Sequence, residues 1–210
     1  CGVDYIGYKS ISLDYDKFQK RLKEMGSLGI KSIMYAGEGE PLLHKRINDI
    51  VQSTYDAGID ISFTTNGTQM DKTFIESSLP LTQWIKLSVN AAKPATYAKI
   101  HQTKEQDFNK VIENIGQATQ YKRDNGLNCT IGVQTLLLPE NADEIEELAQ
   151  LCRDELKVDY LVVKPYSQHR FSKTRKYEKI DYNPYLTLEK KLEKWGTDEF
   201  QLIFRGHTMN

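Results

Sequence analysis

The sequence has few cysteines, almost no net charge and no long apolar run, and each shortage excludes a class of protein. Three cysteines in 210 residues are too few, and odd in number, for a disulfide framework, which predicts a reducing, cytoplasmic setting. No apolar run approaches the ~20 residues of a membrane span and no signal peptide is visible, so we expect no membrane partner. With 28 basic and 29 acidic residues, the charge balance predicts no nucleic-acid partner.

The three cysteines occur in different contexts. Cys129 lies in a strand-like apolar pattern and Cys152 in a helix-like one, so both are predicted to be buried core residues. Cys1 differs, because a chain that begins with Cys in place of Met has been processed or cut. Its role depends on the motifs that follow.

Strand-like and helix-like apolar spacings alternate along the chain, which predicts an α/β protein with parallel strands joined by crossovers. With 39% hydrophobic residues, the chain can bury one sizeable core. We expect one domain over residues 1–180 and the start of a C-terminal extension or linker at residues 181–210. The predicted strands cover residues 30–36, 61–65, 84–89, 130–137, 160–164 and 200–204.

Each predicted strand has one apolar and one polar face. Lys86, Ser88 and Asn90 share one side of their strand, and residues 62–66 and 130–134 alternate in the same way. A parallel sheet covered by helices on both faces would be apolar on both sides. The pattern therefore favours a sheet curled into a full or partial barrel with a polar mouth, and a doubly wound sheet with a few buried polar groups stays the alternative.

The stretch 35–44 concentrates charge and bare backbone directly after a predicted strand. Glu38 and Glu40 alternate there with Gly37 and Gly39, and Pro41 follows. Glycine lets the backbone approach a ligand closely, and proline fixes the first turn of the next helix. This strand exit is predicted to be part of a ligand site.

Four segments at strand ends resemble motifs of the radical S-adenosylmethionine (SAM) superfamily, in matching order and spacing. The Glu-Gly-Glu-Pro run resembles the family's Gly-Gly-Glu-Pro motif, and the Thr-Asn-Gly turn resembles its third-strand turn. The matching segments are 38–43, 65–68, 88–90 with 96–101, and 134–141 with 144–145. Their order and spacing agree with the family over roughly the span from Cys1 to Lys164. The resemblance implies a partial (β/α)6 TIM-like barrel, here lacking the first strand.

The resemblance also assigns expected roles to individual residues. Glu40 would accept hydrogen bonds from the cationic amino group of SAM, with Gly39 letting the backbone approach and Pro41 starting the next helix. Asn66 would support the pocket. The remaining expected SAM contacts are Ser88 and Asn90 at the ribose or carboxylate, and Gln134 and Leu136 near the adenine.

Three departures from the family pattern matter. Glu38 replaces the first glycine of the motif, and Asn90 stands where an aspartate is usual. The family holds a four-iron four-sulfur cluster through a Cys-x3-Cys-x2-Cys run, which this chain lacks. Cys1 stands where the third of those cysteines would be, so we expect it to be a metal ligand of a chain cut within the motif. One thiolate cannot hold four irons, so we expect no normal cluster on this polypeptide.

The resemblance predicts a radical SAM enzyme that makes a 5'-deoxyadenosyl radical and abstracts hydrogen from a peptide or small-molecule substrate. An electron donor such as flavodoxin or ferredoxin would be its partner. Residues 204–209 resemble the approach to a Cys-rich extension that carries auxiliary clusters. Two alternatives remain. One is a non-redox barrel lyase or isomerase that uses Lys164 on a phosphorylated small molecule, with the loop from Arg170 to Lys176 binding the phosphate, and the other is a non-catalytic SAM-binding module.

Overall fold

The computed structural model describes residues 4, 5, 7, 9, 11–37 and 39–209. Within this part of the chain, six strands form one parallel sheet in the order β1-β2-β3-β4-β5-β6, so each strand pairs with its neighbours in sequence. The strands are β1 (Ser32–Tyr35), β2 (Asp60–Thr65), β3 (Trp84–Ser88), β4 (Thr130–Leu137), β5 (Tyr160–Pro165) and β6 (Gln201–Phe204). The predicted alternating α/β order is confirmed.

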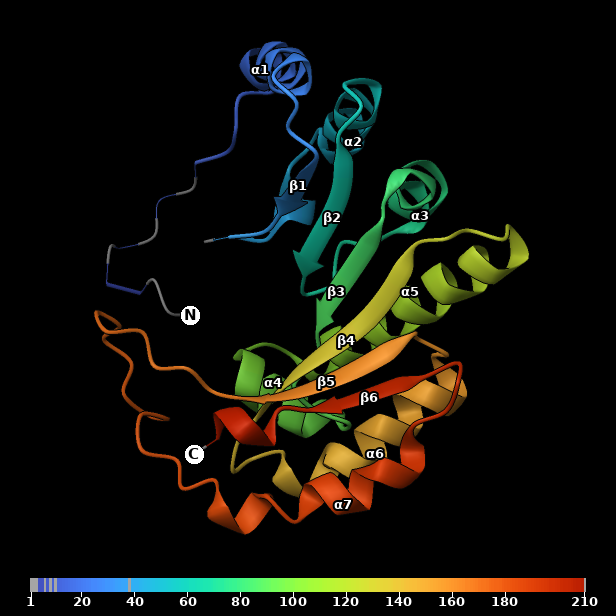
Figure 1. The fold of residues 1–210 in the computed structure, drawn as a ribbon. Coiled ribbons are helices and arrows are strands. Elements are labelled where there is room, and N and C mark those ends of the chain that lie inside the picture. Colours follow the sequence, from blue (N-terminus) through green and yellow to red (C-terminus); the bar gives the residue numbers. More distant parts are fainter. Residues whose placement is uncertain (1–3, 6, 8, 10, 38, 210) are drawn as a thin grey trace.

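Helices connect these strands and lie along one side of the sheet. They are α1 (Tyr15–Ser27), α2 (Ile47–Asp56), α3 (Lys72–Ser77), α4 (Pro94–His101), α5 (Glu105–Asp124), α6 (Ile145–Gln150) and α7 (Leu188–Leu192). Figure 1 shows α1, α2, α3, α5, α6 and α7 along the outer side of the curved sheet. One face of the sheet is thus covered by helices while the other is open, which confirms the barrel-like reading of the strand pattern.

The hydrophobic core lies between the sheet and these helices. The outward-facing strand residues are at most 1% exposed; they are Ile61, Phe63, Ile85, Leu87, Ile131, Val133, Leu161 and Val163. Long helix α5 covers them with Phe108, Val111 and Ile115. Each such side chain contributes about 1.5–3 kcal/mol when removed from water, so this layer stabilises the fold and leaves the inner face free for polar groups.

Local sequence signals place several element ends. The Asp14 carboxylate accepts a hydrogen bond from the Lys17 amide at 3.0 Å and caps α1. Helix α4 ends where Gln102 takes a left-handed conformation with φ of 53°. Strand β1 is shorter than predicted, because Ile30 is 41% exposed and precedes the paired segment.

Residues beyond β5 belong to the same packed unit. Phe204 of β6 pairs with Val163 of β5, and Leu192 of α7 is fully buried. The expected start of an extension at residue 181 stays a prediction. Among the described helices, none is both long and apolar enough to cross a bilayer.

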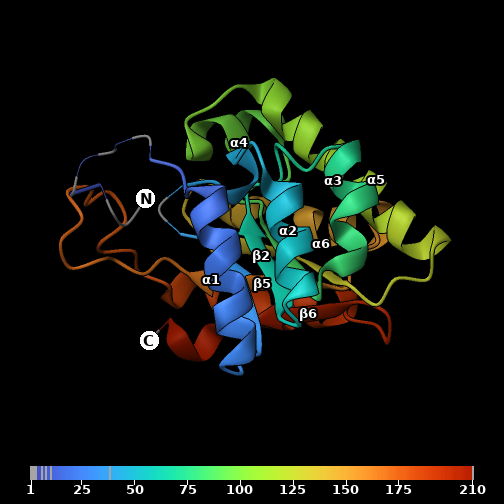
Figure 2. The ribbon, with the colours of Figure 1, turned by 90° about the horizontal axis from the view of Figure 1, so that it is seen from above.

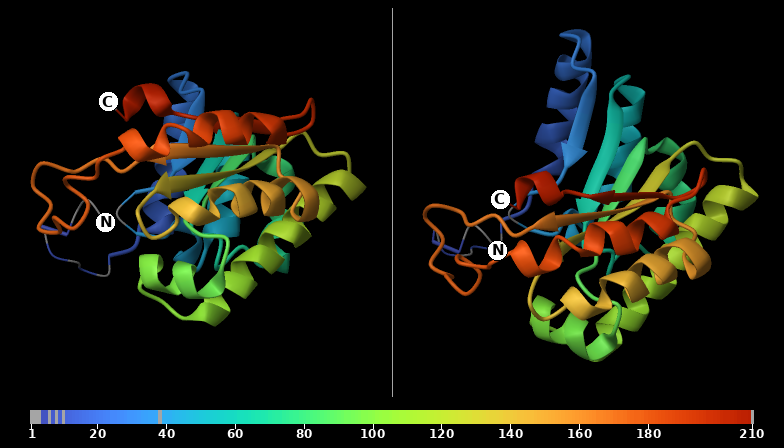
Figure 3. Two further views of the ribbon diagram at one scale, coloured as in Figure 1. Left: turned by 90° about the horizontal axis from the view of Figure 1, so that it is seen from below. Right: turned by 60° about the horizontal axis from the view of Figure 1, so that its bottom comes forward.

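The stretch 166–187 lies beside the N-terminal segment, beyond the carboxyl ends of the strands (Figures 1, 2 and 3). The amides of Lys173 and Thr174 donate to the Asp4 carboxylate, both at 2.8 Å. Tyr5 stacks on His169 with ring centroids 5.2 Å apart. Two segments that are far apart in the sequence therefore contact each other at the edge of the sheet where the predicted site residues lie.

Candidate SAM site at the carboxyl ends of the strands

The predicted Gly/Glu turn borders a cavity of about 770 Å³. Gly39, Glu40 and Pro41 line it together with residues 11–13 and 43–46, and the other predicted SAM residues do not. Gly37 has a φ of 132°, a conformation that favours glycine, and it turns the chain directly after β1. Glu38 lies outside the described residues, so its expected role stays a prediction. The turn thus supplies one wall of a cavity large enough for a cofactor.

The Glu40 side chain joins the exit of β1 to the exit of β2. It caps the short helix η1 (Pro41–Leu43) by accepting a hydrogen bond from the Leu42 amide at 3.1 Å. It also accepts from the Thr65 hydroxyl at 2.5 Å and from the Asn66 amide at 2.8 Å. A carboxylate offers about four acceptor positions, so Glu40 retains about one for a ligand.

Three other predicted residues lie in one row across the open face. Register pairs Ser88 of β3 with Gln134 of β4, and Thr65 of β2 with Leu87 of β3, which places Asn66 beside Ser88. Neighbouring strands are about 4.8 Å apart, so the row spans roughly 10 Å. Such a span suits a ligand of nucleoside length.

The polar atoms of this row are available. The Ser88 hydroxyl and the Gln134 amide form no hydrogen bond within the described residues, and Asn66 uses only its Oδ1, which accepts from the Thr68 amide at 2.9 Å and from the Thr68 hydroxyl at 2.7 Å. All three side chains are partly exposed. These side chains lie on the face of the sheet that the helices leave open, so their polar atoms can form hydrogen bonds with a ligand bound there.

Asn90 and Leu136 hydrogen-bond to each other, unlike the residues of the row. Asn90 is only 9% exposed, and its Oδ1 accepts a hydrogen bond from the Leu136 amide at 2.8 Å. Its Nδ2 lies 3.3 Å from His101 Nε2. Strand β3 ends at Ser88, and the Asn90 side chain joins the segment after it to β4. Its side chain thus shapes the backbone at Leu136.

Sequence reasoning missed Asn141 as an organiser of this edge. It is fully buried, and its amide donates to the carbonyls of Asn90 and Leu136, each at 2.8 Å. Its Oδ1 accepts from the Leu138 amide at 2.8 Å. The signal was weak, since an asparagine after a strand is also an ordinary turn residue.

Glu144 was likewise assigned no role. It accepts hydrogen bonds from the Ala92 amide at 3.0 Å and from the Thr96 hydroxyl at 2.5 Å. These contacts hold the loop between β3 and α4 against the segment that follows β4. Both Asn141 and Glu144 therefore support the row of predicted ligand residues without belonging to it.

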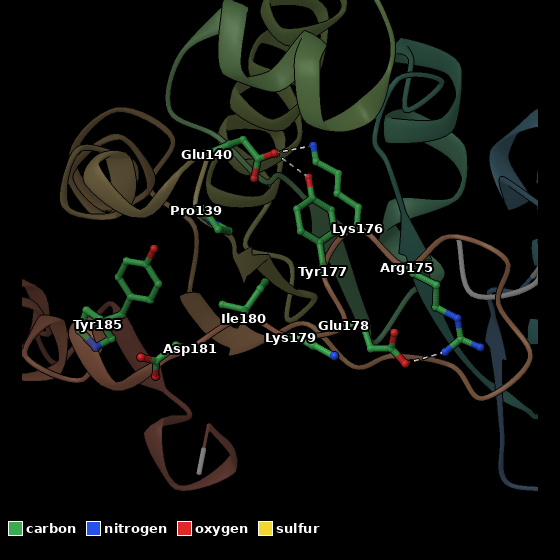
Figure 4. A pocket seen from close by; sticks show the side chains of 11 residues that line it. Pro139, Glu140, Arg175, Lys176, Tyr177, Glu178, Lys179, Ile180, Asp181 and Tyr185 are labelled. Carbon is green, nitrogen blue, oxygen red and sulfur yellow. Dashed lines mark hydrogen bonds and ion pairs between the residues drawn. The ribbon is translucent and has the colours of Figure 1, made fainter.

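A second cavity, of about 760 Å³, lies between the loop after β4 and the stretch 175–185. Figure 4 shows Lys176 and Tyr177 pointing at Glu140, which accepts from Lys176 Nζ at 2.5 Å and from Tyr177 Oη at 3.0 Å. Arg175 pairs with Glu178 at 2.8 Å. Burial opposes ionisation of Glu140, yet Lys176 holds its pKa below the ordinary value. Lys176 and Arg175 each pair with a carboxylate, Glu140 Oε2 is buried without a hydrogen bond among the described residues, and no predicted SAM residue lines the cavity.

The described cysteines do not fit an iron–sulfur cluster. Cys129 precedes β4 at the amino end of the sheet, opposite the candidate site, and burial raises the pKa of its thiol to about 12. Cys152 is fully buried, and burial raises its pKa as well. Cluster ligands are thiolates, so neither residue suits the role. Cys1 lies outside the described residues, and its role as a metal ligand stays a prediction.

Two curated relatives and a solved structure are similar to this chain. A tungsten-containing aldehyde ferredoxin oxidoreductase cofactor-modifying protein of Pyrococcus furiosus is 28% identical over 158 residues, which is 72% of this chain and 42% of the relative. A probable GTP 3',8-cyclase of Methanothermobacter marburgensis is 32% identical over 160 residues, or 74% and 49%. The chain thus spans less than half the length of either relative.

The solved structure of Streptococcus suis SuiB bound to S-adenosylmethionine has a similar fold, with a TM-score of 0.67 and 17% sequence identity. The match covers 98% of this chain and 47% of that one. Residues 1–152 match the sequence profile of the radical SAM superfamily, which is well over half of the chain. With its open parallel sheet and its motifs at the carboxyl ends of the strands, this chain belongs to the radical SAM superfamily.

Proposed function

We propose that this chain is the SAM-binding core of a radical SAM enzyme. The observation that carries the proposal is the row of Asn66, Ser88 and Gln134, whose polar atoms are available on the open face beside the Glu40 turn. Family membership supports SAM as the ligand.

Each residue of the site has a proposed task. The methionyl amino group of SAM binds the remaining acceptor of Glu40 and the backbone at Gly39, because a cation next to a half-buried carboxylate gains a charge-assisted hydrogen bond. Ser88 binds the ribose or the carboxylate, and Gln134 lies near the adenine. Asn90 and Leu136 set the backbone on the adenine side through their mutual hydrogen bond.

For the whole protein we propose a four-iron four-sulfur cluster with Cys1 among its ligands and an electron donor such as flavodoxin or ferredoxin. Together, cluster and SAM supply one-electron cleavage of a sulfonium and hydrogen abstraction from an unactivated carbon. The task of this chain is to hold SAM at the carboxyl ends of the strands, exclude water and place the substrate next to it. A peptide or small-molecule substrate stays a prediction.

The test is SAM binding to the full chain, measured by isothermal titration calorimetry. Replacing Gln134 by Ala removes a side chain that forms no hydrogen bond with the described residues, so stability should change little while SAM affinity falls about tenfold. Thr130→Ala is the matched control, because Thr130 lies on the same face of β4 four residues earlier, at the opposite end of the strand. Equal affinities of both variants and wild type would contradict the proposal.

A further inference from the structure

The open face of the sheet carries three cations, one on β3, one on β5 and one directly after β6. Register pairs Lys86 with Gly132, and Gly132 with Tyr160, so Lys86 and Tyr160 share the inner face. Lys164 lies four residues after Tyr160 and faces the same way. The Arg205 amide donates to the Val163 carbonyl at 2.9 Å, which continues the β5–β6 register and places Arg205 beside Lys164.

None of the three cations forms an ion pair with a carboxylate among the described residues. Burial is the main cause that lowers the pKa of Lys164, and the positive charges of Lys86 and Arg205 lower it further. Register places Arg205 beside Lys164, and Lys86 lies two strands from Lys164 on the same face. Holding like charges together without an acid costs stability unless a ligand neutralises them.

A cavity of about 400 Å³ lies on this face, and it combines charge with apolar surface. Lys86 and Arg205 line it together with Trp84, Tyr160 and Ile203, while Lys164 lies beside Arg205 outside this lining. Lys86 Nζ lies 5.7 Å from the centre of the Trp84 ring, while Ile203 is 41% exposed. The wall thus offers aromatic and aliphatic contacts to the body of a ligand whose anionic end meets the cations.

Gln134 also lines this cavity, so it adjoins the row proposed for SAM. The row occupies the β2–β4 side of the open face, whereas Lys164 and Arg205 lie on the β5–β6 side, and Lys86 lies on β3 two residues before Ser88, nearer the amino end of the strand. A molecule held by the cations would therefore be next to SAM and not in its place.

We propose that Lys86, Lys164 and Arg205 bind the phosphate or diphosphate group of a small-molecule substrate. The role of that molecule as substrate rests on the proposed function, while the binding of the anion does not. Three positive charges match a diphosphate, whereas a single carboxylate would leave two of them uncompensated. Arginine and lysine are the side chains that hold phosphate in proteins, arginine through paired donors and lysine as a point charge.

Binding of inorganic pyrophosphate to the full chain tests the proposal. We expect calorimetry in magnesium-free, low-salt buffer to give a Kd on the order of 0.1 mM that weakens as salt is added. The triple variant Lys86→Met, Lys164→Met, Arg205→Met keeps the aliphatic stems and should weaken binding at least tenfold. The single variants Lys164→Met and Arg205→Met should each weaken it by a smaller factor, which keeps the test decisive even where the triple variant folds poorly.

The matched control removes the same charge elsewhere. Lys23 of α1 and Lys190 and Lys191 of α7 are exposed, and both helices lie on the outer side of the sheet. The triple variant Lys23→Met, Lys190→Met, Lys191→Met should bind pyrophosphate as wild type does. Equal weakening in both triple variants would overturn the proposal, since it would show a nonspecific charge effect. No measurable binding to wild type would overturn it too.

Two further measurements separate the sources of binding. Citrate at equal ionic strength should bind more weakly than pyrophosphate, and tighter citrate binding would overturn the assignment to phosphate. SAM affinity should stay within twofold of wild type in the cation triple variant. A tenfold loss of SAM affinity with unchanged pyrophosphate binding would show that the cations serve SAM instead. Failure of SAM to bind wild type would contradict the proposed function alone, because pyrophosphate is titrated without SAM.

Discussion

At the scale of single residues, polar side chains near the site divide into those the fold uses and those it leaves available. Glu40 accepts three hydrogen bonds from the protein, and both polar ends of Asn90 are engaged. Ser88 and Gln134 form none within the described residues. A motif can therefore mark a site correctly while its members do different work, some shaping the backbone and others facing the ligand.

His101 shows the effect of burial on a single group. Its ring stacks on Tyr97 with centroids 4.1 Å apart, and burial lowers its pKa from 6.5 to about 4. Between those values the unfolded chain binds a proton that the folded chain refuses, so stability is present above pH 6.5 and is lost as pH falls toward 4. The loss amounts to at most about 3 kcal/mol.

The prediction is a pH-dependent difference between wild type and His101→Phe, which keeps the stack on Tyr97 but cannot titrate. In urea unfolding, lowering the pH from 7 to 4.5 should destabilise wild type by about 2 kcal/mol more than the variant. His207→Phe is the control, since His207 is exposed and should behave as wild type. An identical pH response of His101→Phe and wild type would refute the assignment.

At the scale of elements, the site depends on how the ends of β3 and β4 are joined. Strand β3 ends at Ser88. Beyond that point the side chains of Asn90 and Asn141 hydrogen-bond to backbone groups of the neighbouring segment. Glu144 fixes the loop to α4 in the same way. Side-chain hydrogen bonds thus extend the sheet edge past the last strand residue and position the residues around Leu136.

Asn141→Ala should therefore destabilise the fold strongly. It leaves the Leu138 amide and the carbonyls of Asn90 and Leu136 without their partner in a fully buried place, which costs about 2–5 kcal/mol in total. Urea unfolding measures this. Asn125→Ala is the control: its amide also donates to a carbonyl, that of Tyr121, but on the surface, so the change should be below about 0.5 kcal/mol. Similar losses in both variants would show that burial of Asn141 does not matter.

At the scale of the whole molecule, the N-terminal segment and the stretch 166–187 meet beyond the carboxyl ends of the strands (Figure 1). Asp4 makes the contact by accepting hydrogen bonds from the Thr174 hydroxyl at 2.7 Å and from the amides of Lys173 and Thr174. The Thr174 hydroxyl and these amides hold the pKa of Asp4 below its ordinary value. These contacts hold the two segments together beyond the carboxyl ends of the strands.

Asp4→Ala should loosen this contact and expose the basic stretch to protease. Limited trypsin digestion should cut between residues 170 and 179 several-fold faster in the variant, because cleavage requires local opening of the backbone. Asp16→Ala serves as the control, since Asp16 is also exposed and acidic but contacts Arg46 and not this stretch. Equal cleavage rates in wild type and Asp4→Ala would contradict the role given to Asp4.

The sequence alone predicted the order of strands and helices, the apolar and polar faces and the family, because these depend on local spacing and on motifs at strand ends. Alternation placed Ser88 and Gln134 on the open face correctly, since side-chain direction within a strand follows from chain position. The domain boundary at residue 181 and the ligand roles stay predictions.

Only the tertiary structure decided which polar atoms are already paired. Hydrogen bonds such as that between Asn90 and the Leu136 amide join residues 46 positions apart, and no local pattern encodes them. Likewise, Lys86, Lys164 and Arg205 are scattered through the sequence and become neighbours because three parallel strands bring them to one face. Residue type and side-chain direction follow from the sequence, whereas contacts between charges and hydrogen bonds between distant residues form only when the folded sheet brings the strands together.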